Sequence, residues 1–481
     1  MRDIKNMKNK IFVSCFLFLY FVSLLLLFSR RGLGLYLHPF SFDSFMDMFY
    51  MAANPVNSTY PPLSLIPYKI MHLLTHPDIA QAPFDIRGSY YGAFFLMLYI
   101  MAFSTFFLYT MYFSVNGEPK RRVFYSVLFF FSGIVLFAIE RANVMSFAFL
   151  FSLLFVIFYS DGDERKKRMS YVFIAMAISL KLYPGAFLLL VLEKKDIKGL
   201  LTVAVDVIVI FMFSFVVCKY LDFLISFEYN LGLHNYMKNV KAYIKVLFHL
   251  AAVFIIVLAC CYVIYEIYRE KWKALRLIAV ISLVVFILTI LYFYFAKSKN
   301  LFLGIFNVFK PVANALRFGN RMTKSVEGIN LSLKNFILLV NYLLFKRTVI
   351  ENNGLLALCK FFCIGLGLFS FFFNKKKWRK FAALSLLCVY VPDFSGMYLP
   401  LYLFIPLLFF INDADNSKMD CLYACLFAIS LTFVIVPYRF NIPTYYLMTG
   451  SFVLISLSMF SIYVLLVGNA IYDLVKKKND Y

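Results

Sequence analysis

Charged residues are scarce in this chain of 481 residues: Asp, Glu, Lys and Arg make up 15% of it, whereas 63% is hydrophobic. Soluble domains are about 45–50% apolar and about 25% charged. No polar interval is long enough to bury a core of its own, which excludes a separate soluble domain. Apolar runs of roughly 20 residues, the length that crosses about 30 Å of hydrocarbon, recur along the chain instead. We therefore predict an all-α polytopic membrane protein with a single integral domain over residues 1–481.

Several motifs of soluble enzymes are also absent. The sequence has no glycine-rich phosphate loop and no nucleotide-binding fingerprint, which argues against a cytosolic nucleotide-sugar enzyme. Its nine cysteines lie in or at the edge of apolar runs, without a disulfide framework or a zinc-type spacing. His72 and His76 stand four residues apart, but Leu73 occupies the place of the glutamate of a zinc protease. We expect no required cofactor; a divalent metal is compatible with the sequence but not indicated by it.

Basic residues outnumber acidic ones by 48 to 25, which gives a net charge of +23. Lys and Arg accumulate in the cytoplasmic loops of membrane proteins, so we attribute most of this excess to membrane orientation and expect no nucleic-acid partner. The basic clusters assigned to the cytoplasmic side are residues 2–10, 120–122, 165–168, 194–198, 269–276, 375–380 and 476–478. Both termini are then cytoplasmic.

The apolar runs predict about ten long transmembrane helices. They lie at residues 11–29, 88–113, 123–139, 144–160, 199–217, 246–265, 277–296, 354–373, 420–437 and 450–470. Two further intervals, 169–192 and 381–411, connect clusters on the same side, so each is predicted to be a broken helix pair. The predicted hinges are residues 181–184 and 392–398. Broken backbone at membrane depth is tolerated where it lines protein or a watery cavity.

The long loops that remain face outward, and the first of them, residues 30–87, carries two carboxylates. Asp43 and Asp47 are four residues apart and would share one face of a helix, so we expect this extracytoplasmic loop to be catalytic. Further along the same loop, a helix lying on the membrane surface is predicted from its apolar residues. These are Leu63, Ile66, Ile70, Leu73 and Leu74.

Cations and an amide follow at the predicted outer face. Arg141 and Asn143 occupy a short turn between two spans; the planar fork of an arginine suits a lipid phosphate, although the arginine could instead snorkel to headgroups. Lys181 is a charge in an apolar segment, which marks a functional site unless it snorkels from the hinge. The outward loop 297–353 is basic, and Arg317 and Arg321 would lie one helical turn apart. Such a loop would bind a phosphorylated lipid, an anionic glycan or ordinary anionic lipid.

Three motifs in order resemble those of the polytopic GT-C glycosyltransferases. They are Asp43 and Asp47 followed by Tyr-Pro-Pro-Leu at residues 60–63, Glu-Arg-Ala-Asn at residues 140–143, and Leu-Lys-Leu-Tyr-Pro at residues 180–184. The pattern is most similar to glycosyltransferase family 87, the branch of polyprenol-phosphate-mannose-dependent mannosyltransferases of bacterial envelopes. The family usually has glycine where this chain has Ala142.

The resemblance implies an inverting transfer of a hexose-type sugar, mannose among them, from a polyprenyl-phosphate donor to a lipid-linked or envelope glycan acceptor. The reaction would take place on the outer face of the bacterial cytoplasmic membrane. Asp47, or in second place Asp43, would be the general base. The donor phosphate would be bound by Arg141, Asn143, Lys181, Arg317 and Arg321. The substrate pocket would include Tyr60, Tyr183, Asp393 and Tyr398.

Two other functions fit parts of the sequence. A repeat-unit polymerase for a surface polysaccharide also has a large outward loop with arginines, as residues 297–353 would provide. A lipid-linked glycan transporter or flippase would make use of broken helices and of Lys181. The transporter predicts duplicated halves, and residues 240–481 show no second copy of the acidic loop or of the 181–184 hinge.

Overall fold

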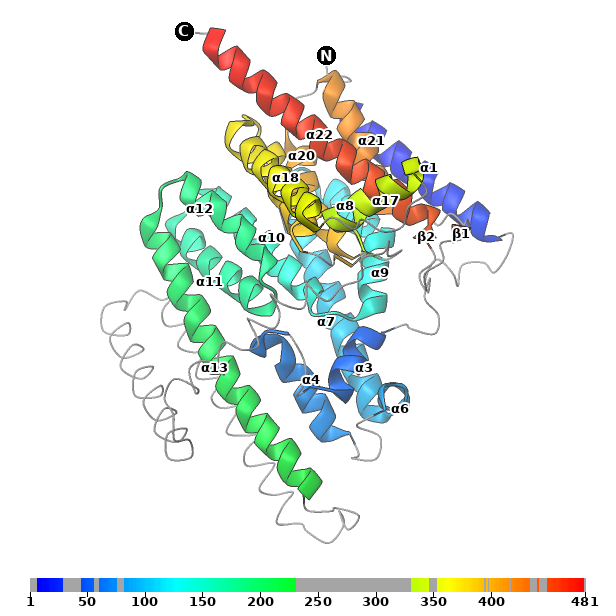
Figure 1. Ribbon diagram of the computed structural model, residues 1–481, viewed down its shortest axis with the longest axis vertical. Coiled ribbons are helices and arrows are strands. Elements are labelled where there is room, and N and C mark those ends of the chain that lie inside the picture. Colours follow the sequence, from blue (N-terminus) through cyan, green and yellow to red (C-terminus); the bar gives the residue numbers. More distant parts are fainter. Residues whose placement is uncertain are drawn as a thin grey trace.

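The described part of the chain is almost entirely helical. A computed structural model describes residues 7–28, 45–55, 60–75, 82–230, 330–345, 353–392, 395–396, 398–414, 417–432, 439–440 and 448–479 (Figure 1). Its strands are β1 (Arg439–Phe440) and β2 (Met448–Thr449), which pair antiparallel. The predicted spans 246–265 and 277–296 lie outside the described residues.

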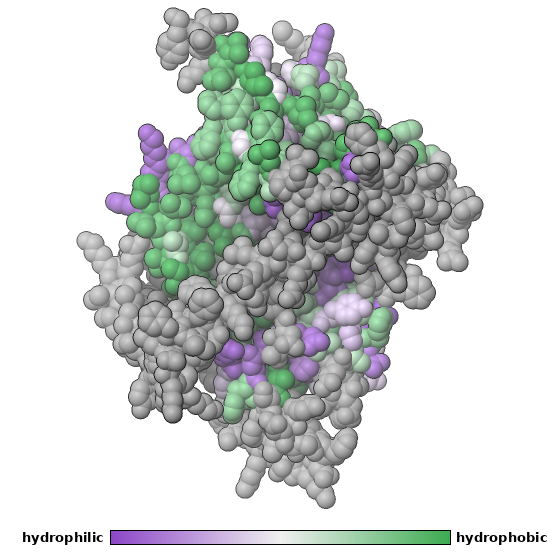
Figure 2. All heavy atoms as spheres, in the orientation of Figure 1, coloured by the Kyte–Doolittle hydropathy of each residue, from purple (hydrophilic) through white to green (hydrophobic). Residues whose placement is uncertain are grey.

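Three described helices are long and apolar enough to cross a membrane: α7 (Tyr90–Ser114), α13 (Ile197–Asn230) and α22 (Gly450–Asn479). A fourth crossing is made if α8 (Pro119–Phe130) and α9 (Gly133–Arg141) count together. On the face shown in Figure 2, hydrophobic residues dominate the upper part of the described surface. The protein is therefore a multi-pass membrane protein.

The prediction of one continuous helix over residues 123–139 was wrong, because α8 and α9 meet at an angle of 54°. The break falls at Phe131 and Ser132. The Ser132 hydroxyl accepts a hydrogen bond from the Val135 backbone at 3.3 Å. A side chain that caps a new helix start satisfies a backbone donor that a continuous helix would have bonded internally.

The core is built around two largely buried helices, α10 (Met145–Asp161) and α19 (Lys377–Tyr390). Ala148, Phe149 and Leu153 of α10 are 0% exposed, and every residue of α19 from Phe381 to Tyr390 is buried. A helix that is apolar on all sides is stable only when neighbours surround it. The neighbours of α19 include α18 (Asn353–Phe373), α17 (Leu333–Phe345) and α21 (Lys418–Thr432), and α1 (Met7–Phe28) packs against α21.

Both predicted helix breaks are confirmed. The helix α11 (Glu164–Leu180) stops before Lys181, and the chain returns through the 3₁₀ helix η2 (Tyr183–Leu188) and α12 (Leu189–Glu193). In the second pair, α19 ends at Tyr390, and the chain returns through η5 (Leu399–Leu403) and α20 (Phe404–Asn412). Each returning arm begins with a proline at its first turn, where a missing backbone N–H leaves no bond unmade.

The two ends of each broken pair lie together. Lys167 near the start of α11 forms an ion pair with Asp196 after α12, at 3.0 Å. Lys376 before α19 forms one with Asp413 after α20, at 3.7 Å. Each pair is thus a hairpin whose hinge lies at the end away from these ion pairs.

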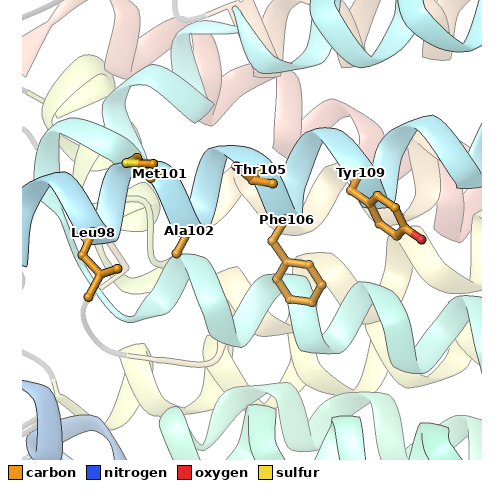
Figure 3. Close-up of a pocket in the computed structure, with 6 residues that line it drawn as sticks. All are labelled: Leu98, Met101, Ala102, Thr105, Phe106 and Tyr109. Carbon is orange, nitrogen blue, oxygen red and sulfur yellow. The ribbon is translucent and has the colours of Figure 1, made fainter.

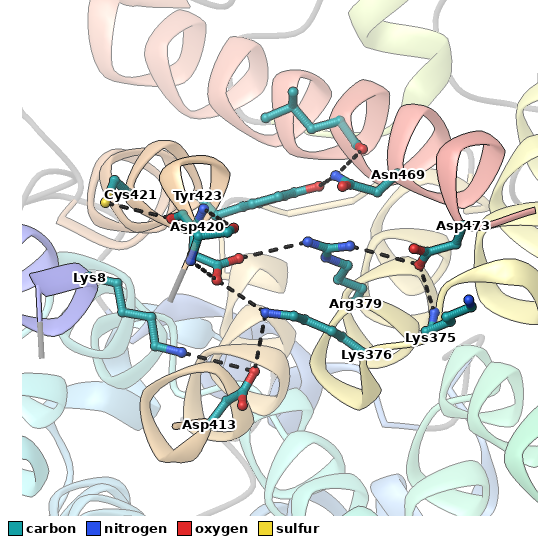
Figure 4. A network of polar contacts seen from close by, with 12 residues as sticks. Lys8, Lys375, Lys376, Arg379, Asp413, Asp420, Cys421, Tyr423, Asn469 and Asp473 are labelled. Atoms are coloured by element: carbon teal, nitrogen blue, oxygen red, sulfur yellow. Dashed lines mark hydrogen bonds and ion pairs between the residues drawn. The ribbon is translucent and has the colours of Figure 1, made fainter. Parts of the chain in front are cut away.

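Polar contacts link two of the predicted cytoplasmic clusters, residues 2–10 and 375–380, to the region just before the third, residues 476–478 (Figure 4). Lys8 reaches Asp413 at 4.0 Å, and Lys376 reaches Asp420 at 3.1 Å. Arg379 lies 3.9 Å from Asp473, shortly before the C-terminal cluster. Six charged groups from distant parts of the sequence therefore share one end of the helix bundle, as the topology prediction requires. The cluster at residues 269–276 lies outside the described residues.

The helix predicted to lie on the membrane surface packs against protein instead. It is α4 (Pro62–Leu74), and its Ile66, Ile70 and Leu73 contact an apolar cluster on α13. Buried Lys69 forms an ion pair with Asp222 of α13. The 34 residues of α13 span about 50 Å, which exceeds the roughly 30 Å of hydrocarbon. The projecting part of α13 therefore covers the apolar face of α4, and the surface-helix prediction is corrected.

Candidate functional site

A tight turn joins α9 to α10 and carries Arg141, Ala142 and Asn143. Ala142 adopts a left-handed conformation with φ 48° and ψ 42°, and it is 1% exposed. The Asn143 carbonyl oxygen Oδ1 accepts a hydrogen bond from the Met145 backbone N–H at 3.0 Å. The buried amide thus fixes the start of α10 and the direction in which Arg141 and Asn143 project. The glycine usual in the family pattern would adopt this φ without strain.

The short helix α3 (Met46–Ala53) brings Asp47 to this turn. Phe45, its N-cap, also has a positive φ, of 63°, and its backbone N–H donates to the Glu140 carbonyl at 2.5 Å. A left-handed conformation costs roughly 1–2 kcal/mol for a residue other than glycine. Backbone strain therefore lies next to Asp47, at Phe45, and between Arg141 and Asn143, at Ala142. Strained backbone of this kind is often found at functional sites.

Four side chains form what we call the polar corner: Asp47, Tyr60, Arg141 and Asn143. Arg141 donates a hydrogen bond from its guanidinium to Asp47 Oδ1 and pairs with it electrostatically. Asn143 Nδ2 lies 3.0 Å from Asp47 Oδ2 and 3.1 Å from the Tyr60 hydroxyl. Both oxygens of the carboxylate accept hydrogen bonds, yet the Asp47 side chain is still 21% exposed. It is oriented and still accessible.

Both helix hinges reach the polar corner. The Lys181 ammonium of the first hinge lies 3.4 Å from the centroid of the Tyr60 ring, a cation–π contact. The Tyr398 hydroxyl of the second hinge lies 3.4 Å from Asn143 Nδ2. A cation and a phenol from two interrupted helices thus stand beside the carboxylate.

A family model for glycosyltransferase family 87 matches residues 59–309, just over half of the chain. The chain belongs to glycosyltransferase family 87. Family membership makes it a glycosyltransferase, which acts on a sugar donor and an acceptor. The matched range includes Tyr60, Arg141, Asn143 and Lys181, and it begins after Asp47. Searches of the curated proteins and of the solved structures returned no match.

In this family 87 glycosyltransferase, Tyr183 of the first hinge contacts α10 and α19. Its hydroxyl contacts Met145 Sδ, and its backbone carbonyl accepts from the Cys388 thiol at 3.4 Å. Tyr183 therefore ties the first hinge to α10 and α19. Asp43, Arg317, Arg321 and Asp393 lie outside the described residues, and their predicted roles stay predictions.

Burial raises the pKa of the Tyr60 hydroxyl well above its ordinary value, and the negative charge of Asp47 raises it further. The hydrogen bond from Asn143 and the charge of Arg141 act in the opposite direction and are smaller. Tyr60 is therefore a neutral phenol over the whole physiological pH range, able both to accept and to donate a hydrogen bond.

The glycosyltransferase has a buried support for the polar corner that sequence reasoning missed. Tyr99 of α7 donates to Ser146 Oγ at 2.9 Å and also lies 3.3 Å from the Asn143 carbonyl. Tyr99 thus supports the turn between α9 and α10 from the neighbouring helix α7. With 34 tyrosines and 60 phenylalanines in the chain, no local signal separated Tyr99 from ordinary packing residues.

The outer face of α7 carries a shallow groove, lined by Leu98, Met101, Ala102, Thr105, Phe106 and Tyr109 (Figure 3). Their spacing places them on one stripe of the helix, and the groove has no carboxylate and no cation. It therefore lacks the chemistry of the polar corner. Within the part of the chain that the structure describes, no three His, Cys, Asp or Glu side chains cluster as metal ligands would.

Proposed function

We propose that this enzyme transfers a hexose-type sugar, with mannose as first choice, from a polyprenyl-phosphate donor to a lipid-linked or envelope glycan acceptor with inversion. The observation that carries the proposal is the polar corner, where Asp47 contacts Arg141 and Asn143 of the turn. Lys181 of the first hinge and Tyr398 of the second hinge reach the same corner. Neither a nucleotide nor a resident cofactor is part of the proposal. The donor supplies the activated sugar through its phosphate ester.

Asp47 acts as the general base that removes the proton from the acceptor hydroxyl. A base must be accessible to the acceptor and held in direction, and Asp47 meets both conditions because it is 21% exposed and bonded through both oxygens. Arg141, in direct contact with the carboxylate, keeps it oriented. Asp43 remains the second candidate for this role.

The leaving group is a lipid phosphate, whose developing negative charge needs a preorganised cation. Inversion requires the base and the leaving group to lie on opposite faces of the sugar. Lys181 stands over the face of the Tyr60 ring, whereas Asp47 is linked to the Tyr60 hydroxyl through Asn143. Of the two described cations at the polar corner, Arg141 contacts the base and Lys181 contacts the Tyr60 ring, so we assign the leaving phosphate to Lys181. Arg141 is engaged with Asp47 through Nη2, and Arg317 and Arg321 remain further candidates.

Purified enzyme in lipid nanodiscs, assayed with a panel of polyprenyl-phosphate sugars, tests the proposal. Asp47→Asn should abolish sugar transfer and leave donor binding nearly unchanged, because the amide cannot accept the acceptor proton. Asp85→Asn is a matched control, since Asp85 is an exposed carboxylate of the same loop, on α6 (Pro83–Gly88). Transfer by Asp47→Asn at the wild-type rate would remove Asp47 from the mechanism.

A second pair of variants separates the two cations. Lys181→Met should weaken donor binding and slow transfer, because the leaving phosphate loses its counter-charge. Arg141→Ala should mainly lower the rate at saturating donor, since Asp47 loses its partner. If Arg141→Ala instead weakens donor binding alone, Arg141 binds the phosphate and the division of roles proposed here is wrong.

We further propose that the polar corner faces outward from the bacterial cytoplasmic membrane, with both termini inside. In Figure 1 the two termini lie at the top, and α3 and α4 lie toward the bottom. The basic residues gathered near the termini suit the cytoplasmic side. Leu182, 40% exposed in the first hinge, offers a test. Leu182→Cys should react with an impermeant maleimide added from outside; reaction only from inside would reverse the orientation.

A further inference from the structure

Tyr398 is the contribution of the C-terminal half of the chain to the polar corner. Its ring stacks on Phe137 of α9 at a centroid distance of 6.4 Å, and its hydroxyl lies 3.4 Å from Asn143 Nδ2. The two N–H groups of that amide face Asp47 and Tyr60 at shorter distances of 3.0 and 3.1 Å. Asn143 is a donor in each case, so the Tyr398 hydroxyl keeps its own proton for another acceptor.

The hinge that carries Tyr398 is fastened by the segment that precedes α17. Asn330 Oδ1 accepts hydrogen bonds from the backbone N–H groups of Ser395 at 2.9 Å and Ser332 at 3.0 Å. The Leu331 N–H donates to the Ser395 carbonyl at 2.6 Å, and Asn330 pairs with Gly396 in an antiparallel bridge. Asn330 is 4% exposed and Ser395 is fully buried.

These bonds pair backbone groups that the break in the helix leaves without intrahelical partners. Backbone groups at the hinge have lost their intrahelical partners, and leaving them unpaired in a buried place costs free energy. A single side chain, that of Asn330, satisfies the Ser395 donor 65 residues away in sequence. Ser395 and Gly396 are therefore held in place beside the start of α17.

The conformation of Gly396 is coupled to the ring of Tyr398. A Cβ atom at Gly396 would lie 2.7 Å from the Tyr398 ring carbon Cζ, closer than side chains approach one another. The Leu399 N–H also bonds back to the Gly396 carbonyl at 2.9 Å. The Tyr398 ring thus rests directly on the backbone that Asn330 holds.

We propose that Asn330 is a positioning residue: by fixing Ser395 and Gly396, it places the Tyr398 hydroxyl beside Asp47, where it binds a hydroxyl of the acceptor sugar. This inference rests on the proposed function of the polar corner and adds a substrate contact supplied from the second half of the chain. A purely structural Asn330 would affect stability alone. A positioning Asn330 affects acceptor binding, and does so only through Tyr398.

A double-mutant cycle tests this difference. The acceptor KM, kcat and thermal stability are measured in nanodiscs, at saturating donor, for Asn330→Ala, Tyr398→Phe and the combined variant. Tyr398→Phe should raise the acceptor KM about tenfold, as expected for the loss of one hydrogen bond. Asn330→Ala should raise it by a similar factor, and the combined variant should be within about twofold of Tyr398→Phe. Asn330→Asp, which retains an acceptor oxygen, should recover most of the loss.

Asn374→Ala is the matched control. Asn374 is also a buried amide, 1% exposed, and it bonds the carbonyls of Ser370 and Leu466 at the opposite end of the bundle. It should lower thermal stability without changing the acceptor KM. If Asn330→Ala does not fold, Gly396→Ala takes its place in the cycle, because the added Cβ displaces the same ring.

The outcomes separate the two proposals. The positioning role would be overturned if the KM of the combined variant rises by the product of the two single effects, or if Asn330→Ala behaves like the control. Sugar transfer by the wild type would stand in either case. No transfer by the wild type from any polyprenyl-phosphate sugar would overturn the proposed function, and the positioning role would be rejected with it.

Discussion

Asn143→Ser and Asn143→Ala remove the same amide donor but leave different groups behind. In the native side chain, Oδ1 accepts from the Met145 N–H at 3.0 Å and Nδ2 donates to Asp47 at 3.0 Å. A serine hydroxyl can still accept from the start of α10 but is too short to reach Asp47, whereas alanine does neither. Comparing the two variants separates helix capping from orientation of the base.

The expected losses of stability and of rate follow from these two hydrogen bonds. Loss of a capping side chain costs about 1 kcal/mol, with a range of roughly 0.5–2, so Asn143→Ala should be less stable than Asn143→Ser by about that much. A hydrogen bond to a charged group contributes about 1.5–3 kcal/mol, which corresponds to a rate loss of about 10- to 150-fold if it acts in the transition state. Because Asp47 is 21% exposed, water can replace part of the lost donor, and we expect the lower end of this range in both variants.

The assay pairs thermal unfolding with kcat/KM for sugar transfer. Asn469→Ser is the control, since Asn469 donates to the Tyr423 hydroxyl at 2.8 Å within the network of Figure 4, far from the polar corner. It should lose stability and keep its rate. A wild-type rate for Asn143→Ser would show that the amide does not orient the base, and equal stabilities of the two Asn143 variants would refute the capping role.

Substitutions at three other positions have expected outcomes. Ala142→Gly should change the unfolding free energy by less than about 1 kcal/mol, because relief of strain is offset by chain entropy and a lost buried methyl. Ala142→Val should unfold at a clearly lower temperature. Equal stability of these two variants would contradict the left-handed turn at residue 142. Asp420→Asn should lower the unfolding free energy by about 3–5 kcal/mol in denaturant titrations, since Asp420 is 0% exposed beside Lys376; a neutral effect would show that the pair is solvated. Gly92→Ala should lower thermal stability because its Cβ would lie 1.9 Å from the Ile86 carbonyl oxygen, and unchanged unfolding would mean that this turn is loose.

The helix breaks were predictable because their causes are local. Lys181 and the proline three residues on interrupt an apolar run between two basic clusters, and α11 ends at Leu180. The bend between α8 and α9 was not predictable in the same way. Its signal is a Ser-Gly pair at residues 132–133, a known site of helix kinks, but the residues on both sides of it are apolar and suggest one span.

The residues of the polar corner, and those of the two hinges that reach it, were predictable in part. Asp47, Arg141, Asn143, Lys181, Tyr60 and Tyr398 were all named from sequence, and the structure brings them together. Their pairing was not predictable. We expected Arg141 to bind the donor phosphate, and it contacts Asp47, 94 residues away in sequence.

The sequence by itself determined the class of the protein, the positions of its hinges and the residue types of the polar corner. Hydropathy, proline and the distribution of basic residues act through neighbouring residues and the bilayer, so each can be read from a short stretch. Only the tertiary structure decided that α4 packs on α13, that Arg141 holds Asp47 and that Asn330 fastens the second hinge. Those outcomes depend on which surfaces meet when helices far apart in the chain are packed together, and no local pattern specifies that meeting.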